Sequence, residues 1–371
     1  MRHSNREKTI IQVINKISIG GVETLTQDLH KQLIISNIES IIFELAPNEI
    51  SRKLFDQKKI RIGVLIFAFT RLILRIGFLD LIKRRNCIVI YNHAECHLVG
   101  SYIPLPSILA PNSVGIMSLF QSPDIYPPKI LPKAIIGFEK ASGVLCYSKN
   151  VSKKWQELIS AQLSYLPLGV TVGSAKGLEP KSNTKRNDRC VRLIHIGRNT
   201  PWKKPERAGI FAQEIAMMGI KVELHFVGIN ENSEVSKLLG NPNLEIYFHG
   251  LIKKVDQELL ESDILVNLFD TSLSGESIGV AALKALTLGK IVVIESMSDT
   301  SFENLNGIFE RKEILQLISN NIKYGKPLLE KIWMSENEYH SNLKTLHIST
   351  YANNLLNLAE NNLLHKKFKK V

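Results

Sequence analysis

Residues Ser274 to Glu295 read SGESIGVAALKALTLGKIVVIE, and this stretch sets the fold that we expect for the whole chain. A glutamate and a glycine stand directly before a helical pattern, VAALKALTLG, whose last glycine leads into the β-branched run KIVVIE. A loop, a helix and a buried strand in this order are part of a βαβ unit, which is typical of a parallel sheet covered by helices.

The same alternation continues on both sides of this stretch. Between residues 190 and 270 the apolar runs and helical patterns are VRLIHIG, PERAGIFAQEIAMMG, KVELHFVG, LEIYFHG, VDQELLESD and ILVNLF. Before residue 170 they are TIIQVI, VETLTQDLHKQLI, IIFEL, CIVIYNH, VGIMSLF and GVLCYS. The sequence therefore predicts an α/β protein with two Rossmann-like domains.

The length and a break in the pattern give the domain boundaries. A chain of 371 residues suits two domains of roughly 150 to 200 residues each. Residues 172–189 concentrate Gly, Pro, Ser and charge, which favours a linker. We predict one domain over 1–171, a second over 190–345, and a C-terminal helix with a basic tail over 346–371. The pattern from residue 302 to residue 364 reads as helical throughout.

The composition excludes several classes of protein. With 44% hydrophobic and 22% charged residues, the chain is neither disordered nor fibrous. Its four cysteines lie far apart without a CxxC pair, which fits neither a zinc ribbon nor a disulfide scaffold and indicates a reducing cytoplasm. The first apolar run, IIQVI, is too short for a secretory signal peptide.

The most apolar stretch, residues 62–82, is long enough to cross a bilayer but carries Arg71, Arg75 and Asp80. Each of these charges costs about 2.5 to 3.5 kcal/mol near the bilayer centre, so we do not expect a spanning helix. A helix packed on the sheet is the main interpretation. An interfacial helix with its apolar face in lipid is the alternative.

The net charge of +12 is unevenly spread, because residues 1–170 hold 21 Lys and Arg against 12 Asp and Glu. Such a field attracts nucleic acid, an anionic membrane or phosphorylated substrates. No nucleic-acid-binding motif is present, so we expect no nucleic acid partner. The tail HKKFKK, residues 365–370, adds a cationic end to the chain. Such a tail either stays in solvent or contacts a membrane surface.

Ligands bind at the carboxyl ends of the strands in open parallel sheets, so the residues after each apolar run are candidate sites. Gly20 and Gly21 follow the first strand and precede a helix. The backbone amides at the start of this helix could bind an anion or a sugar. The alternative is that the two glycines only form an ordinary turn. After the strand VRLIHI, Gly197 precedes Arg198 and Lys203, which place two cations on one loop. Two cations in this position favour the binding of a diphosphate. The alternative is a basic loop that only faces solvent.

The third candidate is the helix start Ser277-Ile278-Gly279-Val280, with Glu276 directly before it. Backbone amides at such a start hold phosphate, while a carboxylate accepts hydrogen bonds from sugar hydroxyls. The fourth is His93 at the end of CIVIYNH, which has either a structural role or a role on the acceptor or sugar side.

Four pieces together resemble the retaining glycosyltransferases of family four: IGGVETLTQDL, HIGRNTPWKKPE, FHGLIKKVDQELLESDILV and GESIGVAALKALTLGKIVV. Their order and spacing match over nearly the whole chain. The resemblance implies the GT-B fold, in which two Rossmann-like domains face each other across a cleft and C-terminal helices cross back to the N-terminal domain. It also implies an acceptor on the N-terminal domain, a nucleotide sugar on the C-terminal domain, and no cofactor or metal.

The resemblance also assigns roles to residues. Arg198 and Lys203 match the family's contacts to the donor diphosphate, and Glu276 matches the first glutamate of an E-x7-E motif, which contacts the donor sugar. Gly20 and Gly21 match a loop beside the donor.

The chain departs from the family pattern at several positions. Lys284 stands where the family has the second glutamate, whose carboxylate accepts hydrogen bonds from the ribose hydroxyls. An ammonium group has no lone pair with which to accept them. Ser277 and Lys204 replace glycines, and Leu168 replaces an asparagine. The family's histidine after the fourth strand is absent, since Phe120 and Gln121 occupy LFQSPD.

Our first hypothesis is a cytoplasmic, membrane-peripheral and metal-independent hexosyltransferase. It would move a sugar with retention from a nucleoside diphosphate donor to a glycan or lipid-linked acceptor in bacterial surface polysaccharide or lipopolysaccharide assembly. The alternative is an inactive glycosyltransferase-like subunit that supports a partner enzyme, which Lys284 and the missing histidine motivate. A nucleotide-sugar epimerase is a third option, but no second acid/base set is visible.

Overall fold

The computed structural model describes residues 8–15, 20–45, 62–83, 85–102, 113–171, 190–238, 240–252, 255–270, 279–296, 305–324, 326 and 336–368. The chain divides into two compact units. Unit 1 comprises residues 1–169 and 348–371, and unit 2 comprises residues 170–347. The predicted linker, residues 172–189, lies outside the described residues, and the domain boundaries given above stay a prediction.

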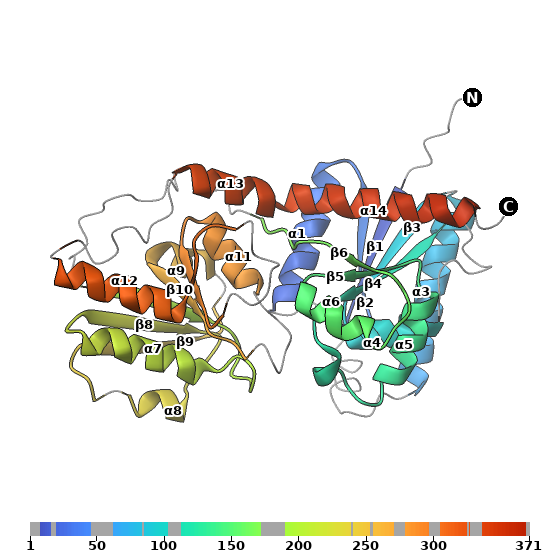
Figure 1. Ribbon diagram of the computed structural model, residues 1–371. Helices are drawn as coiled ribbons and strands as arrows, with labels where there is room; N and C mark the ends of the chain where they lie inside the picture. Colours follow the sequence, from blue (N-terminus) through green and yellow to red (C-terminus); the bar gives the residue numbers. More distant parts are fainter. Residues whose placement is uncertain are drawn as a thin grey trace. The chain divides into compact units, whose positions relative to one another are not determined.

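Unit 1 is built on a parallel six-stranded sheet in the order β2-β1-β3-β4-β5-β6 (Figure 1). Its strands are β1 (Lys8–Ile14), β2 (Glu39–Glu44), β3 (Asn86–Tyr91), β4 (Val114–Leu119), β5 (Gly143–Cys146) and β6 (Leu163–Tyr165). Its helices are α1 (Gly21–Ile35), α3 (Ile62–Gly77), η1 (Phe78–Ile82), α4 (Ala94–Tyr102), η2 (Pro123–Ile125), α5 (Leu131–Lys140), α6 (Lys149–Gln156) and α14 (Ile348–Phe368).

Side chains of this sheet alternate between two buried faces, as expected for a parallel sheet with helices on both sides. On β3, Cys87 and Val89 belong to one apolar cluster, whereas Ile88 and Ile90 belong to the other. Helices α3 to α6 cover the first face, and α1 and α14 cover the second. The apolar stretch of residues 62–82 therefore forms a helix packed on the sheet, which confirms the main interpretation of that stretch.

Unit 2 repeats the plan with a parallel sheet in the order β12-β11-β10-β7-β8-β9. Its strands are β7 (Cys190–Ile196), β8 (Lys221–Val227), β9 (Leu244–Gly250), β10 (Ile264–Asn267), β11 (Ile291–Ile294) and β12 (Ile308–Glu310). Its helices are α7 (Pro205–Met217), α8 (Ser233–Ser236), α9 (Val255–Glu261), α11 (Val280–Thr287), α12 (Arg311–Lys323) and α13 (Glu336–Leu346). The α/β class and two-sheet plan predicted from the sequence are confirmed.

One prediction about the C-terminal region is wrong. The stretch from residue 302 to residue 364 is not helical throughout, because β12 pairs parallel with β11 through Ile308, Phe309 and Glu310. Its three residues are too few to show a period of two beside the helical pattern of α12. The final helix, α14, belongs to unit 1, where it packs on α1 and β4 (Figure 1).

Candidate functional site

The loop after β7 holds the two cations that the sequence analysis singled out. The backbone of Gly197 donates to Val227 O on the neighbouring strand at 3.0 Å, which fixes where the loop leaves the sheet. Arg198 is exposed, and within the described part of the chain no ion pair is found for its guanidinium group. This side chain is therefore available to an external anion.

Lys203 joins this loop to the end of the neighbouring strand β10. Its Nζ lies 3.6 Å from the centre of the Phe269 ring, a cation–π distance. The backbone amide of Asp270 donates to Trp202 O at 2.8 Å, and the Asp270 carboxylate lies 3.7 Å from Arg207. The loops after β7 and β10 thus form one connected edge with Lys203 between them.

Lys204 explains one departure from the family pattern. Its backbone adopts φ 44° and ψ 57°, the left-handed region that favours glycine. A lysine in this conformation carries a cost of roughly 1 kcal/mol or more.

Behind the loop, two buried polar groups face the same edge of the sheet. His195 Nδ1 lies 3.2 Å from Val266 O, and burial, aided by the charge of Lys203, lowers the pKa of His195 to about 4. The ring is therefore neutral near pH 7, with its proton on Nδ1 and an accepting lone pair on Nε2. Among described groups, neither His195 Nε2 nor Asn267 Nδ2 has a hydrogen-bond partner. Both suit a polar ligand or an ordered water molecule at this edge.

The helix start predicted to hold phosphate is described only in part. Gly279 is the N-cap of α11, and Val280 is its first residue. Glu276, Ser277 and Ile278 lie outside the described residues, so their predicted contacts with the donor stay predictions.

Lys284 on α11 has a partner that the sequence did not reveal. Its Nζ lies 3.3 Å from Asp256 Oδ1 on α9, and 17% of the lysine side chain is exposed. The departure from glutamate at this position is thus accompanied by a carboxylate from another helix. A negative group remains beside residue 284, although it comes from α9.

In unit 1, the glycine loop and His93 come together around a glutamate. Gly20 caps α1, and a side chain at this position would have to displace the Glu23 carboxylate. His93 Nδ1 accepts the Asn15 amide proton at 3.2 Å, and Nε2 lies 4.0 Å from Glu23 Oε1. Because Nδ1 accepts this hydrogen bond, a proton on the ring lies on Nε2, the nitrogen nearer to the carboxylate.

The residues found in place of the family's other motifs have structural roles. Phe120 stacks on Tyr147 with ring centres 4.4 Å apart, and the backbone oxygen of Gln121 accepts from Trp155 Nε1 at 2.8 Å. Leu168 packs against the apolar cluster beneath α14. The roles predicted for Gly20, Gly21 and His93 toward ligands stay predictions.

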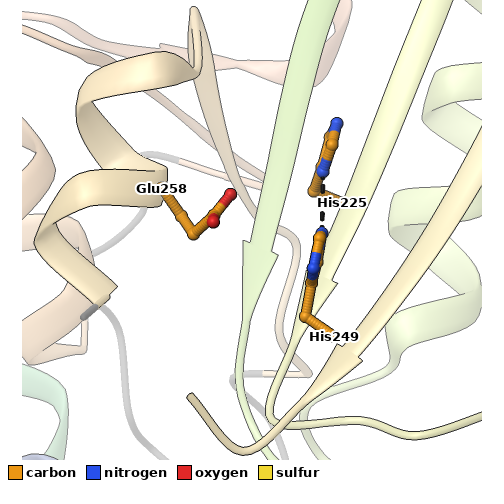
Figure 2. A group of neighbouring side chains, drawn as sticks. All are labelled: His225, His249 and Glu258. Atoms are coloured by element: carbon orange, nitrogen blue, oxygen red, sulfur yellow. Dashed lines mark hydrogen bonds between the residues drawn. The ribbon is translucent and has the colours of Figure 1, made fainter. Parts of the chain in front are cut away.

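One further cluster offers donor atoms that would suit a metal ion. His225 of β8, His249 of β9 and Glu258 of α9 place one donor atom each within 4.8 Å of one another (Figure 2). Two imidazoles and a carboxylate match the ligands of Zn²⁺. His225 Nδ1 and His249 Nε2 lie 2.8 Å apart.

Arg192 accounts for this cluster without an ion. Its Nε–H donates to His225 Nε2 at 3.0 Å, and its Nη2 lies 3.3 Å from His225 Nδ1, the atom that faces His249. The same guanidinium lies 3.3 Å from Glu258 and 2.8 Å from Glu261. A cation bound to His225 would have to displace one of these hydrogen bonds.

Comparisons with known proteins identify the fold. The sequence matches no protein-family model and no curated protein. A glycosyltransferase from Rickettsia africae ESF-5 is similar in structure, with 15% identity, 96% of this chain and 99% of that chain covered, and a TM-score of 0.65.

Two further solved structures are similar over the same extent. One is a variant of S. aureus TarM in complex with fondaparinux, alpha-GlcNAc-glycerol and UDP, with 11% identity, coverages of 95% and 99%, and a TM-score of 0.64. The other is the lipopolysaccharide outer core galactosyltransferase WaaB in its apo form, with 14% identity, coverages of 98% and 100%, and a TM-score of 0.55. With its two parallel sheets, the chain has the GT-B fold found among glycosyltransferases.

Sequence reasoning did not single out Asp256, His195 or Glu23. Asp256 lies 28 residues from Lys284, and nothing in the sequence pairs the two. His195 stands inside the strand VRLIHI, where its polarity is the only signal. Glu23 belongs to the glycine motif, but the sequence does not show that its carboxylate folds back toward Gly20, because this depends on the geometry of α1.

Proposed function

We propose that the protein is a glycosyltransferase that uses a nucleoside diphosphate sugar. The observation that carries the proposal is the pair Arg198 and Lys203 at the carboxyl edge of the unit 2 sheet, where Arg198 is exposed and Lys203 lies over the Phe269 ring. The fold adds support, because a similar structure, TarM, was solved with UDP.

The chemical difficulty of such a transfer is the separation of charge. A sugar with oxocarbenium character forms while a diphosphate departs, so groups that stabilise the departing charge lower the barrier. Arg198 presents a planar fork of donors, and Lys203 a compact ammonium group. We infer that both act on the diphosphate and that the start of α11 at Gly279 adds backbone amides.

We extend the proposal to the finer features that the resemblance implies. These are retention at the anomeric carbon without a metal, a glycan or lipid-linked acceptor, and a role in bacterial surface polysaccharide or lipopolysaccharide assembly. In a retaining transfer from the front face, a diphosphate oxygen can take the acceptor proton, so no protein nucleophile is needed. A cytoplasmic location, peripheral to an anionic membrane, belongs to the same proposal.

A panel of nucleotide sugars tests the proposal when hydrolysis and binding are measured separately. We expect the wild-type protein to hydrolyse at least one donor slowly and Arg198→Ala to lose most of that turnover. The matched control is Lys237→Ala, which removes an exposed cation of unit 2. Binding of nucleotides without any turnover, and unchanged by Arg198→Ala, would favour the alternative of a glycosyltransferase-like binding subunit.

A further inference from the structure

Helix α3 and the π-helical turn η1 that follows it expose an apolar stripe on unit 1. Six large apolar side chains on these elements are between 42% and 69% exposed. We call them the α3–η1 stripe; they are Ile66, Phe67, Leu74, Phe78, Leu81 and Ile82. Large side chains of this kind normally lie inside a domain, and several of them exposed on one helical segment mark an interaction site.

The stripe is not the face that holds the helix in the domain. Ala68, Leu72, Ile76 and Leu79 point the other way and are buried in the core under the sheet. The described side chains of residues 66–82 thus include large apolar groups on both sides, and the inner side alone accounts for the packing. The outer side needs another explanation.

Charge along these elements identifies the partner. Arg71 packs its guanidinium over the rings of Phe43 and Phe67, and the ammonium of Lys83 lies 5.3 Å from the centre of the Phe78 ring. Arg75 is exposed, whereas Asp80, the one acidic residue between positions 62 and 83, is buried. Cations with apolar stems beside exposed aromatic residues suit the headgroup region of an anionic bilayer, where apolar tips enter lipid and charges stay at phosphates.

We propose that the α3–η1 stripe inserts into the surface of an anionic lipid bilayer, with α3 parallel to the membrane plane. None of the described helices is long and apolar enough to cross a membrane, which fits an interfacial position. The inference adds a defined surface and an insertion step to the proposed peripheral location, and it rests on that part of the proposed function alone. The sequence left this segment open between packing and lipid contact, and the two faces of α3 allow both.

Co-sedimentation of the full chain with vesicles tests the inference. The variant is Leu74→Ser with Leu81→Ser, because both side chains are more than half exposed and their loss leaves the core intact. The matched control is Met217→Ser on α7, which removes an apolar side chain that is 74% exposed on unit 2. Vesicles of phosphatidylcholine with phosphatidylglycerol are compared with pure phosphatidylcholine, at low salt and at 0.5 M salt.

We expect the wild type and Met217→Ser to bind the anionic vesicles alike, and the double variant to bind at least tenfold more weakly, about 1.4 kcal/mol. A Leu74→Trp variant should shift its emission to the blue on binding and be quenched by brominated lipids, whereas the wild type should change little.

Two results would overturn the insertion. If the double variant binds as the wild type does and 0.5 M salt releases both completely, charge alone explains the binding and the peripheral location stands without the stripe. If neither the wild type nor any variant binds either kind of vesicle, both the insertion of the stripe and the peripheral location are refuted. Donor turnover without vesicles tests the transfer reaction separately.

Discussion

Reversing the charge of Lys284 should weaken unit 2 and lower activity, because its ammonium group already has a partner. Lys284 Nζ and Asp256 Oδ1 lie 3.3 Å apart, with 17% and 42% of the side chains exposed. Two unit charges at this separation attract by about 1.3 kcal/mol at the dielectric constant of water and by about 5 kcal/mol at a dielectric constant of about 20. Solvent screening reduces the net value of such half-exposed pairs to about 0.5 to 1 kcal/mol.

Lys284→Glu replaces this attraction with repulsion, so we expect a loss of about 1 to 2 kcal/mol in the free energy of unfolding. For a unit of this size, that corresponds to a fall of roughly 2 to 8 °C in Tm. Asp256→Lys in the Lys284→Glu background reverses the pair and should restore at least half of the loss. Urea unfolding of the wild type, Lys284→Glu, Asp256→Lys and the double variant, at low and high salt, measures the coupling free energy.

The exposed pair Lys237 and Glu234 is the matched control. Its charged atoms lie 2.6 Å apart, closer than in the first pair, but 67% and 63% of the side chains are exposed. We therefore expect a smaller coupling free energy there. A coupling between Asp256 and Lys284 that is no larger than that of the control would refute the reasoning.

Activity and nucleotide binding complete this test. We expect Lys284→Glu to lower turnover at least tenfold, since a carboxylate added on α11 would oppose the diphosphate that we propose to bind at the start of this helix. If the reversed pair regains stability but not turnover, Lys284 also contacts the donor directly. Tighter binding of nucleoside diphosphates by Lys284→Glu would instead support the inactive binding subunit.

Three further predictions follow from the unit 2 edge. Arg198→Ala and Lys203→Ala should each lower donor turnover by at least tenfold, since each lost charge-assisted hydrogen bond costs on the order of 1.5 to 3 kcal/mol; circular dichroism should show folded proteins, and near-normal turnover would exclude the altered residue from the site. Lys204→Gly should raise Tm by a few degrees, since it relieves a left-handed backbone at φ 44°, and an unchanged or lower Tm would contradict this. Because the pKa of His195 falls from 6.5 to about 4 on folding, the unfolded chain binds more protons between those values, so stability should fall as the pH drops from 6.5 to 4. His195→Asn should flatten this part of a urea-unfolding series, and a slope equal to that of the wild type would argue against the assignment.

The strands of both sheets were predictable because their residues are buried on two faces. Runs such as CIVIY and KIVVI need no alternation in a parallel sheet. Glycines directly after the runs VRLIHI and KVELHFV mark the carboxyl edge of the second sheet. β6 and β12 were missed, because each has only three residues and so carries too little pattern.

The candidate site was predictable only where one loop holds its residues. Arg198 and Lys203 share a loop, so their spacing alone brings them to one edge of the sheet. Asp256 and Lys284 lie on different helices, and their contact depends on how α9 and α11 pack on the sheet. The left-handed backbone conformation of Lys204 could not be predicted either, because lysine rarely adopts a positive φ.

The position of α14 sets an order for folding during synthesis. Unit 1 is discontinuous: Leu355 and Ala359 of α14 are fully buried against a sheet made at the start of the chain, and Tyr351 hydrogen-bonds Tyr147 at 3.1 Å. All of unit 2 is translated between these two parts. The part of this sheet face that α14 covers, beside α1, therefore stays without its helix while the second unit is made. Apolar surface exposed for that interval is prone to premature aggregation.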